Sequence, residues 1–133
     1  MSGPLLDRID LHVEVPAVPF DQLSSTGSGE SSAIVRDRVI AARERQSARL
    51  LDSPGITCNA HMGPSELHRL RPSGDVLALL QRAIDRLGLS ARAYHRILKV
   101  ACTIADPEDA ERLRTTHTAE AIQYRTLDRH VLA

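Results

Sequence analysis

The stretch Ser90–Asp106 carries the clearest helical pattern in the sequence, and it constrains the fold more than any other segment. Its apolar residues recur every three or four positions, which places them on one helix face. These residues are Tyr94, Ile97, Leu98, Ala101, Ile104 and Ala105. Ser90 can accept a hydrogen bond from the first turn, and Gly88 is suited to ending a preceding helix. Pro107 stops the helix because proline lacks an amide donor and restricts the residue before it.

Arg92 is unusual within this helix because it lies in the first turn, where the helix dipole disfavours a cation. Such a position indicates that Arg92 contacts an anion or a partner outside the helix. The alternative is an ordinary solvated arginine on the surface.

Helical patterns cover most of the chain from Ile34 onward and predict a mainly α protein with a bundle of four or five helices. Apart from the central helix, the expected helices are one over 33–51 entered through Ser31 or Ser32, a short one from Pro64 that closes before Pro72, one over 74–87, and a last one over 117–128 capped by Thr115 or Thr116.

Residues 9–15 alternate strictly between apolar and polar side chains, which predicts one half-buried β-strand that ends at Pro16. No second strand follows, so its partners are expected outside this chain. The Ser- and Gly-rich composition after it predicts a flexible linker. The chain is therefore expected to divide into an arm over 1–20, a linker over 21–32 and a helical domain over 33–129.

Composition excludes several classes of protein. The 133 residues suffice for about one domain with a real core. The 17 basic and 17 acidic residues balance, so the whole chain is not a general polyanion binder, although a local patch remains possible. Two cysteines give no disulfide framework and fit a reducing cytoplasm. No apolar run approaches the ~20 residues of a membrane helix, and the N-terminus has no signal pattern.

Few motifs in the sequence could carry chemistry. Cys58 and His61, with His68 nearby, have half of a zinc-ligand spacing, but the second half is absent, so no metal site is expected. There is no GxxxxGK[ST] loop, so this chain by itself is not expected to bind and hydrolyse ATP in the P-loop manner. Three arginines, Arg38, Arg45 and Arg49, follow one flank of the first helix and could contact nucleic-acid phosphates. The alternative is a solvated helix face, because acidic neighbours dilute the charge.

Five blocks of the sequence, taken together and in order, resemble the C-terminal region of the magnesium-chelatase-like AAA+ ATPases of the ComM/YifB family. They are SGPLLDRIDLHVEVP from Ser2, GESSAIVRDRVIAARERQSARL, CNAHMGPSEL, RLGLSARAYHRILKVACTIAD and AERLRTTHTAEAIQYR. The resemblance implies an N-terminal domain and a P-loop core ahead of this region. Residues 1–20 would then be the end of the ATPase core, and 33–129 its helical C-terminal lid.

The resemblance also implies roles for two arginines. Arg8, in LLDRID, matches the family's arginine finger, which acts on the nucleotide of a neighbouring subunit. Its structural alternative is a local ion pair with Asp7 or Asp10. Arg92, in SAR, matches the sensor-2 arginine, which contacts nucleotide phosphate. ATP and Mg²⁺ are expected in the full-length protein, and neither is expected to bind this chain alone.

The resemblance further implies a homo-oligomeric motor, expected to be a hexamer, that acts on DNA in transformation or recombination. Two alternatives stay open: a magnesium-chelatase subunit that drives metal insertion, and a stand-alone helical module that binds nucleic acid or protein. The sequence departs from the family pattern at three positions, where Cys102 replaces an arginine and Pro107 and Thr118 each replace a leucine. Thr118 is expected to weaken the core modestly.

Overall fold

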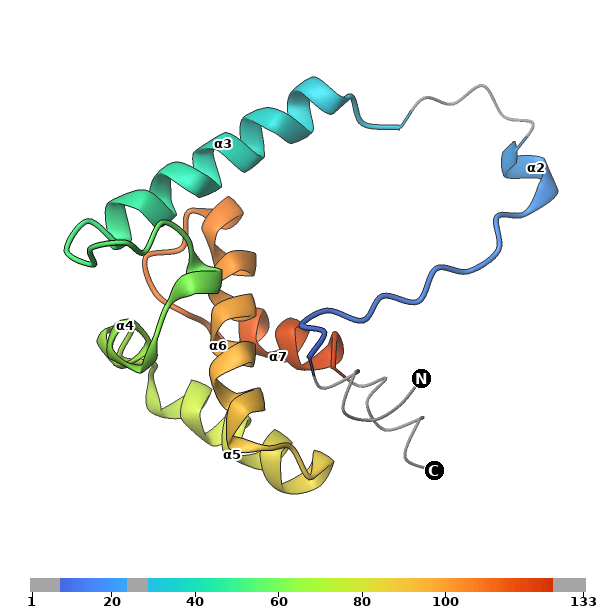
Figure 1. Ribbon diagram of the computed structural model, residues 1–133. Helices are drawn as coiled ribbons and strands as arrows, with labels where there is room; N and C mark the ends of the chain where they lie inside the picture. The colour runs from blue at the N-terminus through green and yellow to red at the C-terminus, as the bar shows by residue number, and fades with distance from the viewer. Residues whose placement is uncertain (1–7, 24–28, 126–133) are drawn as a thin grey trace.

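The computed structural model describes residues 8–23 and 29–125 (Figure 1). The α-helices are α2 (Phe20–Leu23), α3 (Ser32–Arg49), α4 (Pro64–Arg69), α5 (Gly74–Leu87), α6 (Ala91–Ala105) and α7 (Thr115–Gln123). Two short 3₁₀ helices are η1 (Asn59–His61) and η2 (Asp106–Glu108). No strand occurs in these two described ranges. This arrangement confirms the predicted mainly α fold. No helix in the described part is long and apolar enough to cross a bilayer.

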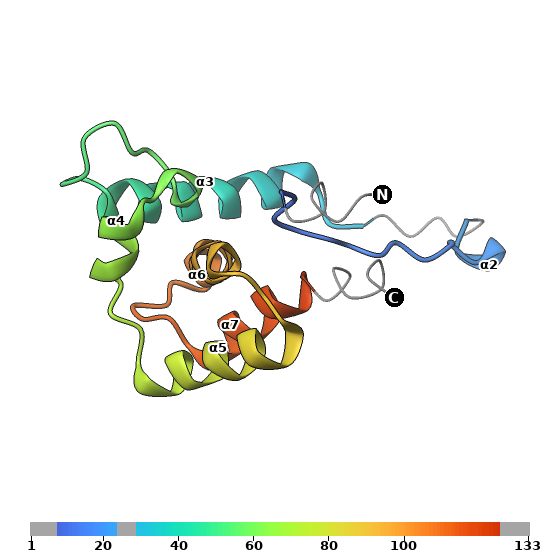
Figure 2. The same cartoon turned by 60° about the horizontal axis from the view of Figure 1, so that its bottom comes forward.

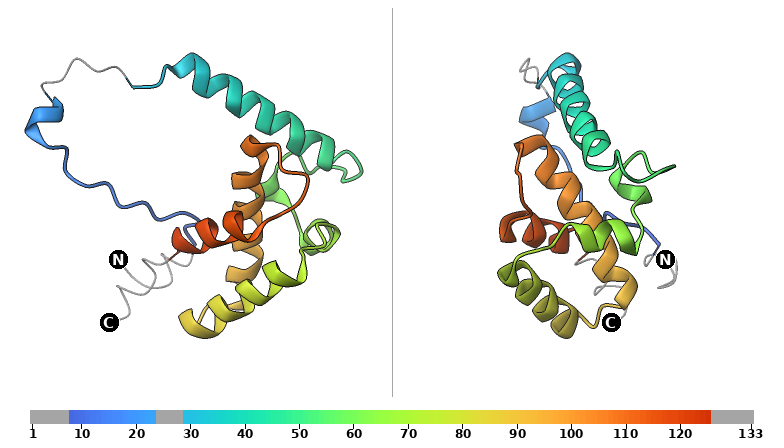
Figure 3. Two further views of the ribbon diagram at one scale, coloured as in Figure 1. Left: turned by 180° about the vertical axis from the view of Figure 1, so that it is seen from behind. Right: turned by 90° about the vertical axis from the view of Figure 1, so that its left-hand side faces the viewer.

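Helix α6 lies at the centre of the bundle. It contacts α4, α7, η1 and η2, and α7 in turn contacts α5. Figure 2 shows α6 end-on, with α3 on one side and α5 and α7 on the other. Seen from behind, α7 crosses α6 (Figure 3). The segment with the strongest helical pattern in the sequence is therefore the one around which the other helices pack.

The apolar core forms on the predicted face of α6. Ile97, Leu98, Ala101 and Ala105 are buried, while Tyr94 and Ile104 are partly buried. All of these except Ala105 pack in one cluster with Leu50, Met62, Leu67, Val76, Leu80 and Ala121. Cys102 also points into this core, and burial raises the pKa of its thiol to about 11. An arginine at this position would place a cation where the thiol now packs.

The ends of α6 and of its neighbours follow the residues expected to form them. Ser90 Oγ accepts a hydrogen bond from the Ala93 amide at 3.3 Å, and Ser31 caps α3 in the same way. Gly88 has a φ of +61°, the left-handed conformation that ends many helices. Helix α6 stops at Ala105, and Pro107 follows in the first turn of η2. The backbone N–H groups of a first turn have no acceptor within the helix, so the N–H that proline lacks is not needed there.

The structure corrects the predicted bounds and N-cap of the last helix, α7. It begins at Thr115, two residues before the expected start, and its N-cap is Arg114, not Thr115 or Thr116. The cause is His117, whose ring Nδ1 accepts the Arg114 amide hydrogen bond at 3.2 Å and so takes the part of a capping side chain. Thr118 is fully buried, but its hydroxyl donates to the Arg114 carbonyl at 3.1 Å. The helix also ends earlier than the expected residue 128, at Gln123 with Tyr124 as its C-cap.

The predicted strand over 9–15 does not form. Residues 11–19 run without helix or strand pairing, and Leu11, Val13 and Val15 expose 49%, 64% and 81% of their surface. A strand needs a neighbour to satisfy its backbone, and none is present in the described residues. The expected linker over 21–32 begins within α2 and overlaps the first residue of α3. The proposed domain boundaries stay predictions.

Candidate functional site

Arg8 lies in a turn at the start of the described chain and is exposed. Its side chain makes no hydrogen bond or ion pair with another described residue. The alternative role for Arg8 was a local ion pair with Asp7 or Asp10. The Oδ1 atom of Asp10 instead lies 3.3 Å from Arg96 Nη1 on α6. Asp7, the other, lies outside the described residues. The Arg8 guanidinium is therefore not paired with Asp10.

The residues that follow Arg8 are held by the helical domain. The His12 amide donates to the Tyr124 carbonyl at 2.9 Å, directly after α7. The Arg125 guanidinium donates to the Ile9 carbonyl at 3.4 Å, and Arg125 is only 2% exposed. Figure 1 shows the start of the described chain meeting the end of α7. Sequence reasoning did not find Arg96 or Arg125 as contacts of this segment, because each lies far from it along the chain.

Arg92 lies in the first turn of α6, as predicted, and is exposed. It makes no hydrogen bond or ion pair with another described residue. One turn further on, His95 and Tyr94 line a cavity of about 450 Å³ whose other walls include His68 and Arg71. The exposed guanidinium thus stands at the end of the central helix, where it can meet an anion outside the bundle.

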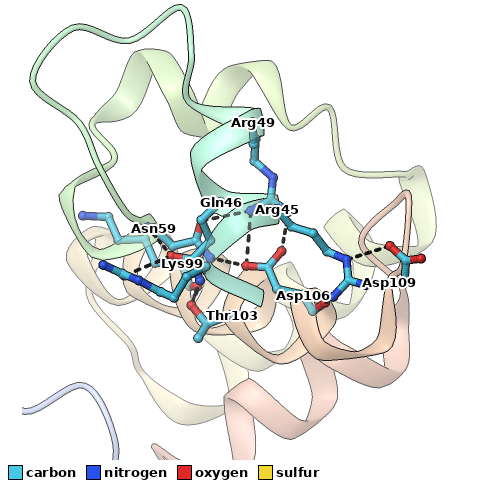
Figure 4. Close-up of polar contacts among 9 residues, drawn as sticks. Arg45, Gln46, Arg49, Asn59, Lys99, Thr103, Asp106 and Asp109 are labelled. Atoms are coloured by element: carbon cyan, nitrogen blue, oxygen red, sulfur yellow. Dashed lines mark hydrogen bonds and ion pairs between the residues drawn. The ribbon is translucent and has the colours of Figure 1, made fainter. Parts of the chain in front are cut away.

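The three arginines of the predicted nucleic-acid flank are placed differently from Arg8 and Arg92. Arg38 donates to Glu30 at 2.7 Å. Arg45 Nε donates to Asp109 Oδ1 at 2.7 Å, and its Nη1 donates to the Asp106 carbonyl at 2.6 Å (Figure 4). Arg49 forms an ion pair with the Asp106 carboxylate. Each guanidinium is therefore already engaged by an acidic residue.

Asp106 is the centre of a buried polar network between α3 and the end of α6 (Figure 4). Asn59 Nδ2 donates to Asp106 Oδ2 at 2.8 Å, and Arg49 Nη1 donates to Asn59 Oδ1 at 2.9 Å. The backbone N–H of Asn59 donates to Gln46 Oε1 at 3.2 Å. Burial lowers the pKa of Arg49, but the hydrogen bond and charge of Asp106 outweigh it, so that pKa is raised. The sequence gives no signal that pairs these residues, which come from three separate segments.

Cys58 and His61 lie on or beside η1. Within residues 8–23 and 29–125, no group of three or more His, Cys, Asp or Glu side chains is arranged to hold a metal ion. Burial tends to raise the pKa of the Cys58 thiol, but hydrogen bonds from Arg43 and from the backbone of His61 and Ala60 outweigh that effect and lower it.

Comparison with known proteins defines the class of this helical domain. The family model described as magnesium chelatase, subunit ChlI C-terminal, matches residues 29–125. Competence protein ComM of Haemophilus influenzae is 44% identical over 131 residues, which cover 97% of this chain and 25% of that protein. YifB of Salmonella typhimurium and YifB of Escherichia coli are 44% and 42% identical over the same shares of each chain.

The match over α3 to α7 defines a magnesium-chelatase-type C-terminal helical domain. The chain belongs to the ComM/YifB family of magnesium-chelatase-like AAA+ proteins. It spans about a quarter of the length of the curated relatives that it matches.

Proposed function

We propose that this chain supplies two phosphate-contacting arginines to an oligomeric AAA+ ATPase. Arg8 acts as the arginine finger on nucleotide bound by a neighbouring subunit, and Arg92 acts as the sensor-2 residue on nucleotide phosphate. The P-loop core that the family resemblance implies would hold ATP and Mg²⁺. We expect a cytoplasmic homo-oligomer, a hexamer by the same resemblance.

The observation that supports this proposal is the contrast between two groups of arginines. Arg8 and Arg92 are exposed and make no contact with a carboxylate of another described residue, whereas Arg38, Arg45 and Arg49 each have such a partner. A guanidinium without a carboxylate partner fits phosphate oxygens, because its charge is permanent and its planar donors match their geometry. Such a residue stabilises the charge that spreads over the transferring phosphoryl group.

The test is steady-state ATP hydrolysis by the full-length protein that contains this chain, with Arg8→Ala compared with wild type. The rate should fall by ~10³–10⁵, the range found for arginine fingers in related phosphoryl-transfer systems. ATP binding and assembly, followed by nucleotide titration and light scattering, should persist. Arg112→Ala is the matched control, because Arg112 is also an exposed arginine. An unchanged rate in Arg8→Ala would overturn the proposal.

We further propose that the motor acts on DNA. The name of the Haemophilus influenzae relative refers to competence, and that relative and the two YifB proteins match nearly the whole chain. The alternative is metal insertion, which the name of the matched family model favours. Stimulation of ATP hydrolysis by DNA, measured with and without single- and double-stranded oligonucleotides, separates the two tasks.

A further inference from the structure

The segment after Arg8 is fixed at three points, one on helix α6 and two on the residues that follow α7. Asp10 pairs with Arg96 on α6 at 3.3 Å, and the backbone of Ile9 and of His12 bonds to Arg125 and Tyr124 after α7. Arg8 itself stays exposed beside this anchored stretch. Its position relative to the helical domain is therefore set by its neighbours and not by its own side chain.

Arg96 is the contact that reaches α6. It follows Arg92 by four positions, so the two residues lie one turn apart on the same face of the helix. Lys99 also lines the cavity of about 370 Å³ beside Asp10, but its ammonium donates to the Ala60 carbonyl at 2.9 Å. Arg96, with its side chain 25% exposed against 58% for Asp10, is the cation that holds this carboxylate.

We propose that Arg96 is a positioning residue for Arg8. Through Asp10 it ties the Arg8 turn to the helix that carries Arg92, so that contact with a nucleotide at Arg92 is linked to the placement of the finger of the same subunit. Helix α6 joins the two arginines, and rigid secondary elements are among the structures that carry coupling between sites. This inference rests on the proposed function of Arg8 and Arg92.

The first test compares Asp10→Asn, Arg96→Gln and the charge-exchanged double variant Asp10→Arg/Arg96→Asp in the full-length ATPase. Each single variant should lower kcat by at least about tenfold, since a displacement of about 1 Å can cost ~10²-fold in rate. The KM for ATP should stay within a few-fold of wild type, because Arg96 does not touch the nucleotide in this scheme. The exchanged pair should recover most of kcat, and Arg112→Gln should behave as wild type.

A second test needs no nucleotide and uses the chain itself. The His12 amide donates to the Tyr124 carbonyl, so its hydrogen exchange reports whether the segment after Arg8 stays docked. Arg96→Gln and Asp10→Asn should each speed exchange at His12 while far-UV circular dichroism stays unchanged. If Arg96→Gln fails to fold, Asp10→Asn decides, because Asp10 is exposed.

The outcomes separate this inference from the proposed function. Loss of hydrolysis in Arg8→Ala, with normal kcat in both Asp10→Asn and Arg96→Gln, overturns the positioning role and leaves the finger in place. Unchanged His12 exchange in both variants overturns it as well. Normal hydrolysis in Arg8→Ala instead overturns the proposed function.

Discussion

At the scale of single residues, the arginines of α3 differ in how deeply their partners are buried. The Asp106 side chain is 1% exposed and pairs with Arg49, whereas Glu30 is 42% exposed and pairs with Arg38. Removing one partner of a buried pair leaves an uncompensated charge, while exposed pairs contribute little. The two arginines therefore form a matched comparison on a single helix.

We predict that Arg49→Ala lowers the free energy of unfolding by about 2–4 kcal/mol, somewhat below the full range for a buried pair because Arg49 is itself part-exposed. Arg38→Ala should cost about 0–1 kcal/mol. Urea denaturation followed by circular dichroism measures both. Equal losses in the two variants would contradict the structural role of the Asp106 network.

The sequence could predict residues whose role is local, and it missed those whose partners are distant. Ser90 and Gly88 act within a few positions of themselves, and both were identified correctly. The partners of Arg45 and Arg49 lie 61, 64 and 57 positions away, and nothing in a helical pattern specifies such pairs. His117 was missed as a capping residue because histidine is rarely used for that purpose.

At the scale of the helical elements, Gly88 controls the turn between α5 and α6. Its φ of +61° favours glycine, and a Cβ there would meet no atom within 4 Å, so only the backbone conformation opposes a side chain. Gly74, at the start of α5, also has open space around it and no positive φ. The two glycines thus differ in conformation alone.

We predict that Gly88→Ala destabilises the protein by about 1–2 kcal/mol, the cost of placing an L-residue in the left-handed region. Gly74→Ala should be neutral or slightly stabilising, because alanine has the higher helix propensity. Thermal denaturation compares the two. A neutral Gly88→Ala would mean that the turn can relax to another conformation.

The sequence predicted the helices correctly but predicted a strand that does not form, and the reason is physical. A helix satisfies its backbone within one segment, so its pattern and its ends are readable in the chain. The alternation over 9–15 is equally regular, but a strand forms only beside another strand. Arg92 lies in the first turn of the predicted central helix, whereas the Asp10–Arg96 contact required the tertiary structure. The roles of Arg8 and Arg92 stay predictions.

At the scale of the whole molecule, the net charge is zero, and much of the positive charge on α3 is neutralised in place. This bears on the alternative in which the chain alone binds nucleic acid through Arg38, Arg45 and Arg49. A variant that removes Arg45 loses both its positive charge and its structural contact, so a change in DNA affinity could not be assigned to either one. Asp109→Asn breaks the same ion pair and keeps the cation.

We predict that Arg45→Gln leaves the DNA affinity of this chain almost unchanged, while Asp109→Asn raises it by removing the carboxylate that neutralises the Arg45 guanidinium. The measurement is fluorescence anisotropy with duplex DNA across a series of salt concentrations, with circular dichroism to check the fold. A fall in affinity in Arg45→Gln, with the salt slope reduced by about 1, would instead identify Arg45 as a phosphate contact and support the stand-alone module.

The central position of α6 has a mechanical consequence. Its 15 residues make a rod about 22 Å long, at about 1.5 Å per residue. Arg92 lies at one end, and Asp106, just past the other, is bound to α3 by the polar network. A rotation of α6 by about 5° about its Asp106 end would displace the Arg92 end by roughly 2 Å. A small change in the angle of α6 at Asp106 is therefore converted into a larger displacement of Arg92 at the opposite end of the helix.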